Sequence, residues 1–539
     1  MSLSKLEKGS VEFTEDVSSD VSPGQSDVLV DSSGEIRRLP IPSKDPNDPL
    51  NFSFAAKLGI IVSCCWFSMM SLSVTGGLGS VLGVFDALYA PEGVSATEVG
   101  WLTTFPSLFI GIGNYFILPL GLAFGRRPAT LMAIIVLIAA TIGCGFTQTY
   151  DQHLALRIIQ GLATGATESL LPLMLSEVTF VHQRGKTFGL YWGTQTIVSS
   201  CMNLASSYEV AALGWRWYYW IFVITIGLGG LVAFFGCFET AYRRSAQVVN
   251  GSVVVTDNFG VTRILSGEEA QVYLSSNTAA ENDGDNIPDE LRPKKPYREL
   301  IKPWSHTGNP PLATVLQTWL HMLQALTSPG IIYATLLSSA VLAAALGMSL
   351  TYDTVLQDNY GWPAANVGLI NLGGVFGSLG GMLYGGIFAD WFIIKMAKRN
   401  NGIHTPEHRL LLLIFPGVLS VFSLLLYGFT ASGNVTWGAP YMAWTLFEVA
   451  FVAVLIISTA FAAEAWDQNA GPALVIVVGT KNIISFGIAY ALIPMVEKYS
   501  YGAGMGMLAG VTTFIFILGI PVYKYNPKWR QYMENKSKN

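Results

Sequence analysis

Apolar blocks of roughly twenty residues alternate with short polar segments along most of the chain. A helix of this length crosses a hydrocarbon layer about 30 Å thick, so each block predicts one transmembrane helix. The blocks form two groups of six. They cover residues 57–84, 98–121, 128–147, 154–176, 186–207 and 217–238, then 329–351, 366–394, 410–430, 439–462, 472–495 and 503–524. The pattern therefore predicts an all-α membrane protein with twelve transmembrane helices in two six-helix bundles.

Polar segments set the domain boundaries. We predict a disordered tail over 1–53, an N-terminal bundle over 54–239, a linker over 240–328, a C-terminal bundle over 329–525 and a tail over 526–539. The linker stretch SSNTAAENDGDNIPDELRPKKP is charged and poor in aromatic residues, as disordered linkers are. The stretch PPLATVLQTWLHMLQAL has helical periodicity. It is interpreted either as an interfacial helix at the membrane surface or as a soluble helix packed on the bundle.

Composition supports a lipid bilayer as the main surrounding. The chain is 51% hydrophobic and 12% charged, whereas soluble domains carry about 25% charge. No stripe of Lys and Arg indicates a nucleic-acid partner. All five cysteines lie inside apolar blocks without C-x-x-C spacing, so we expect small buried side chains and neither a disulfide framework nor a metal site. The first fifty residues have no apolar core, so no cleavable signal peptide is expected.

Lys and Arg collect in alternate connections between the predicted helices, and the connections between them carry almost none. Because positive residues stay on the cytoplasmic side, both termini and the linker are predicted to be cytoplasmic. The sequon at Asn434 then lies outside, where it is a candidate for glycosylation. We expect a multi-pass protein of the plasma membrane that acts as a monomer.

Two similar stretches occupy equivalent places in the two halves. LPLGLAFGRRPATL follows the second helix and GGIFADWFIIKMAKRNNG follows the eighth, and each joins a glycine-containing turn to a cationic run. Such repeats typify secondary transporters with a site between two pseudo-symmetric bundles. Together with DPNDPLNFS (45–53), RIIQG (157–161), GWRW (214–217), FETAYRR (238–244) and RNNGIHTPEHRL (399–410), these stretches resemble fungal members of the major facilitator superfamily. The resemblance is nearest to the 12-span drug:proton antiporters and the yeast polyamine/histidinol permeases.

This resemblance implies the major facilitator fold, with the first, fourth, seventh and tenth helices around a central cavity. It also implies a motif that gates the cytoplasmic side, formed by Gly125, Arg126, Arg127, Gly386 and Asp390. Two features depart from the family pattern. The first copy of the loop signature has Leu118 and Leu122 where the family has Gly and Asp, and the fifth helix lacks the Gly-Pro signature of the antiporters.

The stretch LRIIQGLATGATESLLPLM places Arg157 and Glu168 in one apolar helix. Eleven residues at about 100° each bring both side chains to within about 20° of one face, roughly 16 Å apart. Since an ionised side chain at mid-bilayer costs about 2.5–3.5 kcal/mol, it should face a cavity or a partner. We interpret this stripe as the wall of a transport pathway. Structural hydrogen bonding, for example to Gln160, is the alternative.

Glu448 and Lys481 lie at similar depth in the tenth and eleventh helices. Two interpretations stay open for Glu448, namely proton or substrate binding and a purely structural ion pair with Lys481. Asp353, at the outer end of the seventh helix, is interpreted as a solvated gate residue. Side chains that could contact a substrate are Trp66, Trp192, Asn203, Tyr352 and Trp444. All six histidines lie in loops or at helix edges, so the carboxylates are the candidate proton carriers.

The energy source is constrained by what the sequence lacks. A phosphate-binding loop ending in GKT (185–187) would need glycine at position 180, where the chain has Phe180, so no such loop is predicted. The glycine runs at 76–83 and 373–381 are interpreted as sites of close helix packing. No enzyme activity or cofactor is predicted. The chain is interpreted as a secondary transporter that exports drugs or metabolites in exchange for protons by alternating access. An uptake permease for polyamines and a membrane sensor that binds ligand without moving it are the alternatives.

Overall fold

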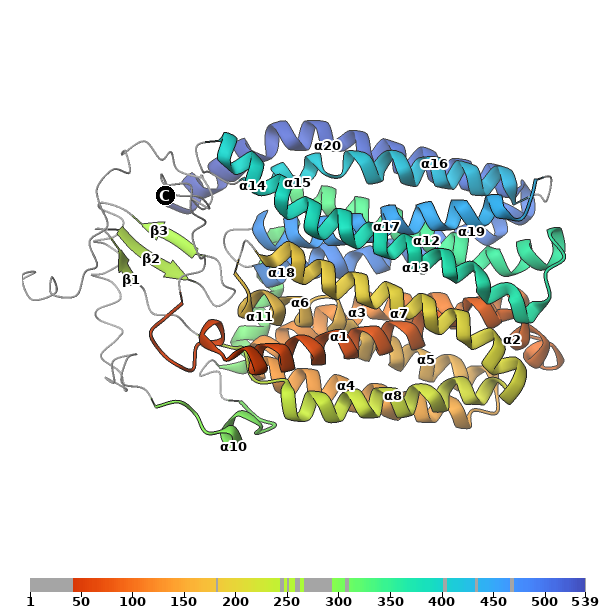
Figure 1. Ribbon diagram of the computed structural model, residues 1–539, viewed down its shortest axis with the longest axis horizontal. Helices are drawn as coiled ribbons and strands as arrows, with labels where there is room; N and C mark the ends of the chain where they lie inside the picture. The colour runs from red at the N-terminus through yellow and green to blue at the C-terminus, as the bar shows by residue number, and fades with distance from the viewer. Residues whose placement is uncertain are drawn as a thin grey trace, which may run out of the picture.

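The computed structural model describes residues 42–180, 183–242, 247–249, 252–256, 262–265, 293–305, 310–400, 405–431, 435–465 and 470–538. Long helices run side by side along the longest axis of the molecule (Figure 1). The linker segments and both ends of the described chain lie at one end of this bundle, which we call the linker end. The opposite end, where α2 lies, is called the far end. The predicted glycosylation site at Asn434 and most of the N-terminal tail lie outside the described residues.

The N-terminal half contains six membrane-spanning units. They are α1 (Phe54–Gly76) with η3 (Gly77–Val81) and α2 (Leu82–Tyr89), α3 (Ala96–Phe124), α4 (Arg126–Phe146), α5 (Tyr150–Thr164) with η5 (Gly165–Thr167) and α6 (Leu170–Val178), α7 (Arg184–Leu213) and α8 (Trp215–Gly236). Short glycine turns join neighbouring helices. Gly125 at φ +111° and Gly214 at φ +89° adopt backbone conformations that other residues rarely take, so glycine permits α3–α4 and α7–α8 to reverse direction within one residue.

The C-terminal half contains six further units. They are α12 (Pro329–Thr354) with η8 (Val355–Asn359), then η9 (Ala364–Leu369), α13 (Ile370–Met382), η10 (Leu383–Phe388) and α14 (Ala389–Arg399), then α15 (His408–Leu411) with α16 (Ile414–Thr430), then α17 (Gly438–Ala465), then α18 (Ala470–Leu474), η11 (Val475–Gly479) and α19 (Thr480–Lys498), and finally α20 (Tyr501–Lys538). The predicted all-helical membrane region with two groups of six helices is therefore confirmed.

Eleven of these units are long and apolar enough to cross a membrane, among the residues that the structure describes. The unit outside this set is α7, which has 30 residues but carries many Ser, Thr, Asn and Gln side chains. α7 packs against α1 on one side and against α13 and α17 on the other, so its polar face is covered by protein. Large exposed apolar side chains instead cover the outer faces of α4, α8, α16 and α20, where lipid would contact them.

Small residues bring the two halves into contact. α3 packs against α19 and η11, and a side chain on Gly111 would come within 2.7 Å of the Gly479 carbonyl oxygen. Within the C-terminal half, glycines on α13 allow equally close packing against α17, since a side chain on Gly377 would lie 2.5 Å from the Thr445 carbonyl oxygen. The expected packing role of the second glycine run, 373–381, matches this geometry.

The linker contains structure that the sequence did not predict. β1 (Gln247–Val249), β2 (Ser252–Thr256) and β3 (Thr262–Leu265) form an antiparallel sheet in the order β1-β2-β3, with Val254 opposite Gln247 and Ile264. The short helix α10 (Tyr297–Leu300) follows, and then α11 (Pro311–Ala325). The stretch that was predicted to be disordered lies almost wholly outside the described residues.

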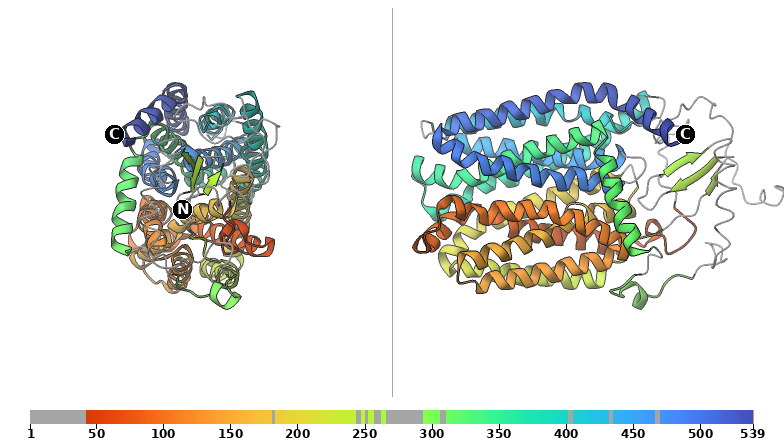
Figure 2. Two further views of the ribbon diagram at one scale, coloured as in Figure 1. Left: turned by 90° about the vertical axis from the view of Figure 1, so that its left-hand side faces the viewer. Right: turned by 180° about the vertical axis from the view of Figure 1, so that it is seen from behind.

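α11 crosses the linker end at a steep angle to the long helices (Figure 2). It packs against α3 of the N-terminal half and against α18 and η11 of the C-terminal half. The Trp319 indole Nε1 donates to the Tyr115 carbonyl oxygen at 2.9 Å. The opposite face of α11 exposes Leu312, Leu316 and Leu320. Contact with the bundle on one face and exposed leucines on the other favour an interfacial helix over an ordinary soluble one.

Candidate functional site

A cavity of about 130 Å³ lies between the two halves, near the middle of the long helices. Both halves contribute its walls, which are formed by Leu72, Thr75, Gly76, Thr103, Ser107, Ile110, Glu168, Trp192, Gln195, Leu342, Leu346, Phe451, Leu455, Lys481 and Asn482. The first, fourth, seventh and tenth spans all line it, as the family resemblance implied, and the second, fifth and eleventh spans line it as well.

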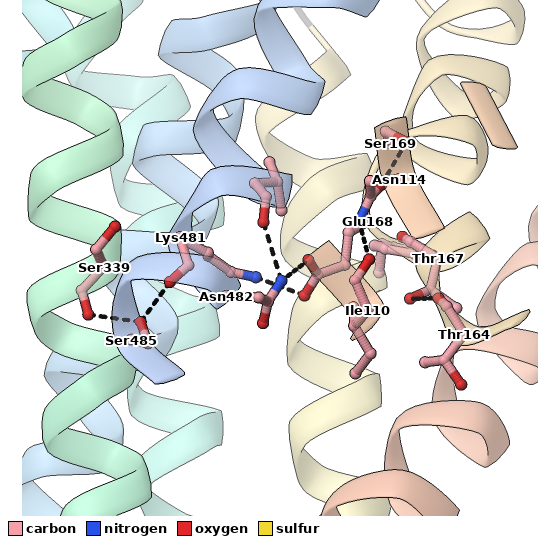
Figure 3. A network of polar contacts seen from close by, with 12 residues as sticks. Ile110, Asn114, Thr164, Thr167, Glu168, Ser169, Ser339, Lys481, Asn482 and Ser485 are labelled. Atoms are coloured by element: carbon pink, nitrogen blue, oxygen red, sulfur yellow. Dashed lines mark hydrogen bonds and ion pairs between the residues drawn. The ribbon is translucent and has the colours of Figure 1, made fainter. Parts of the chain in front are cut away.

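An ion pair crosses the cavity from one half to the other (Figure 3). The Lys481 Nζ of α19 lies 2.5 Å from Oε1 of Glu168, and Asn482 Nδ2 donates to Oε2 of the same carboxylate. Lys481 also lies over the ring of Trp192, 5.6 Å from its centroid. Of the two interpretations of Glu448, the structural ion pair with Lys481 is therefore wrong, because the ammonium group is held by Glu168 of the opposite half.

Irregular backbone positions both partners. The fourth span is interrupted between α5 and α6 by η5, and Glu168 follows that interruption directly. In the eleventh span the π-helical segment η11 ends one residue before the helix α19 that carries Lys481 as its second residue. Neighbouring hydrogen bonds hold these segments in place, since Ser169 Oγ donates to Asn114 Oδ1 at 2.5 Å and Ser485 Oγ donates to the Ser339 carbonyl oxygen at 2.8 Å (Figure 3).

The interruption also separates Arg157 from Glu168. The prediction of one straight stripe is wrong, because α5 ends at Thr164 and only Glu168 lines the cavity. Arg157 is fully buried, and its guanidinium donates to the carbonyl oxygens of Leu102 at 2.9 Å and Val74 at 2.6 Å. It also donates to Gln160 Oε1 at 3.0 Å. Since α1 changes to η3 just after Val74, Arg157 donates to carbonyl groups at a helix break. For Arg157, the structure therefore agrees with the alternative of structural hydrogen bonding, including the bond to Gln160.

Glu448 is buried in the C-terminal half outside the cavity walls, with 7% of its surface exposed. Among the described residues it has neither an ion pair nor a hydrogen bond to its carboxylate. Trp444 lies one helical turn away on α17, and its ring contacts Tyr352 with centroids 5.6 Å apart. Glu448, Trp444 and Tyr352 thus gather on one side of the central cavity.

The remaining candidates for substrate contact lie elsewhere. Trp66 donates from Nε1 to the Thr225 carbonyl oxygen at 2.9 Å and packs on Gly229 of α8, so it has a packing role and not the substrate contact that was considered. Asn203 lies beside Gly77, where α1 gives way to η3. Asp353 is half-buried at the far end and accepts a hydrogen bond from Gln357 Nε2 at 2.5 Å.

The residues of the gate motif make two kinds of contact. Asp390 joins the halves, because it accepts from the Lys186 backbone N–H at 2.9 Å at the first turn of α7. Arg126 pairs with Glu177 of its own half at 2.8 Å. Arg127 donates to the carbonyl oxygens of Phe234 and Ile301, so it fastens the segment after α10 to the end of α8.

Two glycines complete this motif. Gly125 forms the turn between α3 and α4, and Gly386 in η10 faces Gly189 of α7 across the interface. A side chain on Gly189 would lie 3.1 Å from the Gly386 Cα atom, so these glycines allow close contact of the two halves beside Asp390.

The halves contact each other on both sides of the cavity. Toward the linker end, Tyr115 and Thr480 hydroxyls lie 2.6 Å apart, in addition to the Asp390 contact. Toward the far end, Tyr208 donates to Asn366 Oδ1 at 3.0 Å. At the depth of the cavity, the rings of Phe105 and Phe486 pack with centroids 5.4 Å apart. The two halves therefore contact each other both toward the linker end and toward the far end of the cavity.

Several important residues escaped sequence reasoning. Asn482, which follows Lys481 directly, is one of them, and an amide beside a buried lysine is the signal that could have found it in an apolar helix. The partners Glu177 and Glu464 were missed as well; each lies near the end of a span and pairs with an arginine. His153 is fully buried between the hydroxyls of Tyr89 at 2.9 Å and Tyr219 at 2.6 Å, although its position at the start of α5 suggested an edge.

The cysteine prediction needs one correction. Cys201 is exposed on α7, whereas the other four cysteines are buried as expected. Among the described residues, no group of three or more His, Cys, Asp or Glu side chains is arranged to hold a metal ion.

The helices, the cavity between two halves and the buried ion pair define a membrane transporter, and comparison with known proteins agrees. The pattern of the Major Facilitator Superfamily matches residues 58–492, so the chain belongs to this superfamily. It is a secondary transporter of small molecules that spans the membrane several times, and not an enzyme.

Relatives support this assignment at low identity. The chain is 25% identical over 510 residues to an uncharacterized MFS-type transporter of Schizosaccharomyces pombe, covering 91% of this chain and 87% of that protein. It is 21% identical over 496 residues to the efflux pump radE of Floropilus chiversii, covering 90% and 84%. The solved structure of the proton:xylose symporter XylE has the same fold, with a TM-score of 0.55 and 13% identity, covering 88% of this chain and 95% of that one.

Proposed function

We propose that this protein exports small organic molecules across a membrane in exchange for protons, by alternating access. The observation that carries the proposal is the ion pair between Glu168 and Lys481, which joins the two halves inside the cavity at 2.5 Å. Both side chains are almost fully buried, with 4% and 3% of their surfaces exposed. Because this ion pair joins the two halves, a change in the charge of the Glu168 carboxylate changes how strongly the halves hold together.

Protonation of Glu168 provides the coupling step. A neutral carboxylic acid no longer attracts the Lys481 ammonium group, so the contact between the fourth and eleventh spans weakens. The halves can then separate on one side of the cavity while the contacts on the other side persist. Loss of the proton restores the charge and draws Lys481 back. A gradient drives this cycle only if protonation changes the relative stability of the two states, which this ion pair permits.

The contacts at the two ends provide the gates of this cycle. Asp390 with the Lys186 backbone N–H closes the linker end, and Tyr208 with Asn366 closes the far end. We infer that the linker end faces the cytoplasm, because the Lys and Arg residues of the connections gather there. The name of the efflux pump of Floropilus chiversii supports outward transport.

A proton-movement assay tests the role of Glu168. Purified protein is placed in liposomes that contain the pH dye pyranine, a pH gradient is imposed, and ethidium, rhodamine 6G or 2-phenylethylamine is added as a probe. We expect at least one probe to drive proton movement across the membrane in liposomes with the wild-type protein, seen as a change in pyranine fluorescence. Liposomes with the Glu168→Gln variant should not show this change. Glu98→Gln is the matched control, because glutamine at that position preserves the capping box that begins α3.

The result can contradict the proposal in two ways. Wild-type proton movement by the Glu168→Gln protein would remove Glu168 from the mechanism. Probe flux without any proton movement in the wild type would leave a transporter that is not coupled to protons.

Uptake of polyamines or related cations is the second candidate function. It is favoured by the fifth span, which lacks Gly-Pro, and by the unpaired carboxylate of Glu448. Cells that carry the gene and a deletion strain are compared for accumulation of labelled spermidine. Higher accumulation in cells with the gene favours uptake, and lower accumulation favours export.

A further inference from the structure

One face of α17 continues the wall of the cavity toward the far end. Phe451 and Leu455 line the cavity. Glu448 precedes Phe451 by three residues and Trp444 precedes Glu448 by four, so all four side chains lie on one stripe of the helix. Glu448 therefore lies about one helical turn from the cavity wall, on the face that points toward the interface with α7 and α13.

Glu448 differs from the other buried glutamates in lacking a partner. Glu168, Glu177, Glu407 and Glu464 each form an ion pair with a lysine or an arginine at 2.5 to 2.9 Å. The carboxylate of Glu448 accepts no hydrogen bond and forms no ion pair among the described residues, although 93% of the residue is buried. A buried charge without a partner is strongly unfavourable, so this position requires a proton or an external cation.

Further polar atoms without partners surround Glu448. The indole Nε1 of Trp444 and the hydroxyl of Ser378 are buried and unpaired among the described residues. Gly374 of α13 faces both Trp444 Nε1, 3.3 Å from where a Cβ atom would stand, and Ser200 Oγ of α7. Ser378 follows Gly374 by one helical turn, as Glu448 follows Trp444, and α13 and α17 run in the same direction. These groups therefore lie at matching depth between α7, α13 and α17.

The charges of the whole site determine what could bind there. Glu168 and Lys481 neutralise each other, so the cavity and its extension carry one uncompensated negative charge, at Glu448. Trp444 lies one helical turn from Glu448, its ring contacts the ring of Tyr352, and aromatic faces attract cations. An anionic ligand would find Lys481 already occupied and would meet the unpaired carboxylate nearby. The charge balance therefore favours a cation.

We propose that Glu448, Trp444 and Tyr352 form the subsite for the ammonium group of an organic amine, whose apolar body occupies the central cavity. This proposal rests on the transport function proposed above and names its substrate class. The cavity of about 130 Å³ suits a body of ring size, since an apolar cavity of about 150 Å³ admits benzene. A proton and an amine would compete for the Glu448 carboxylate, so the affinity for the amine depends on pH, whereas the coupling step stays at Glu168.

Three probes of one shape test the proposal. 2-Phenylethylamine, 2-phenylethanol and phenylacetate share a ring and a short chain but differ in charge. Their binding to the purified full-length protein in lipid nanodiscs is measured by isothermal titration calorimetry without any gradient. We expect the amine to bind at least about tenfold more tightly than the alcohol or the acid, which is the scale of one lost buried charge contact. Its affinity should fall as the pH is lowered.

Variants identify the carboxylate that binds the amine. Glu448→Gln should weaken amine binding by about tenfold or more, whereas Glu448→Asp should retain most of it. Glu98→Gln, whose side chain lies outside the cavity walls, should bind the amine as the wild type does. Melting temperatures of all three variants establish that they fold. If Glu448→Gln does not fold, the amine affinity of Glu448→Asp tests the site.

Four results would overturn the subsite. These are amine binding no tighter than that of the alcohol, tighter binding of phenylacetate, an unchanged amine affinity in Glu448→Gln, and an equal loss of affinity in Glu98→Gln. Failure of the proposed function looks different, because a protein that binds the amine at Glu448 but moves no protons contradicts only the coupled transport. Proton-coupled movement of phenylacetate, in contrast, contradicts only the subsite.

Discussion

The two halves of the molecule share their scaffold contacts but differ in their central carboxylates. In the N-terminal half, Arg126 at the start of α4 pairs with Glu177 near the end of α6 at 2.8 Å. In the C-terminal half, Arg409 in α15 pairs with Glu464 near the end of α17 at 2.6 Å. Each contact joins the start of the third span of a half to the end of the fourth span. The repeated contacts hold each bundle together at the linker end.

Helix packing is repeated as well. A side chain on Gly113 of α3 would overlap the Leu162 carbonyl oxygen of α5, and one on Gly377 of α13 would lie 2.5 Å from the Thr445 carbonyl oxygen of α17. Both contacts join the second span of a half to its fourth span. Glycine is required at both positions because backbone atoms of the neighbouring helix fill the space.

The central acids do not repeat. Glu168 precedes Glu177 by nine residues, and the residue nine before Glu464 is Leu455, which also lines the cavity. The C-terminal half carries its acid, Glu448, seven residues or about two turns before Leu455, and this acid has no partner among the described residues. The backbone differs too, since 3₁₀ turns η3 and η5 interrupt the first half and π-helical segments interrupt the second. Repeated contacts therefore belong to the fold, and the groups that differ are the candidates for coupling and binding.

The largest expected effect comes from breaking the ion pair between the halves. Glu168→Gln or Lys481→Met alone leaves one buried polar partner without its counterpart, and we expect each to lower the free energy of unfolding by about 3–5 kcal/mol. The double variant removes both groups and should recover most of that loss while proton-coupled flux stays absent. Thermal unfolding in detergent micelles and the pyranine assay measure the two effects. Additive losses of stability in the double variant would contradict a direct pair.

Breaking the repeated pairs should give smaller and matched effects. Arg126→Met and Arg409→Met each remove the arginine partner of one buried glutamate side chain, and the exposed fractions of the two pairs are similar, 5%/4% and 3%/6%. We expect each variant to lose about 3 kcal/mol of stability. Binding of 2-phenylethylamine should remain within about threefold of the wild type in both, because neither arginine reaches the cavity. A loss confined to one arginine would show that the two pairs are not equivalent.

Sequence reasoning recovered the architecture better than the site. Runs of apolar residues determine where helices cross a bilayer, so the twelve spans and their division into two groups could be predicted. The position of Glu168 depended on more than sequence spacing, because the η5 interruption rotated it away from Arg157. The partner of Lys481 could not be predicted either. The sequence gives the depth of a residue along its helix, but it does not give the face with which that helix contacts the other half.

The smallest effect distinguishes two tryptophans, one in each half. The Trp66 indole donates to the Thr225 carbonyl oxygen, so Trp66→Phe should cost about 0.5–1.5 kcal/mol of stability through the lost hydrogen bond and leave amine binding unchanged. The Trp444 indole N–H has no partner among the described residues, so Trp444→Phe should leave stability nearly unchanged. It should weaken 2-phenylethylamine binding a few-fold, about 0.5–1 kcal/mol, since Phe is a poorer cation-binding ring than Trp. Calorimetry and melting curves on the same samples compare the two variants. If Trp66→Phe and Trp444→Phe lose the same stability and both keep the wild-type amine affinity, Trp444 has a packing role only. The proposed subsite would then not include Trp444.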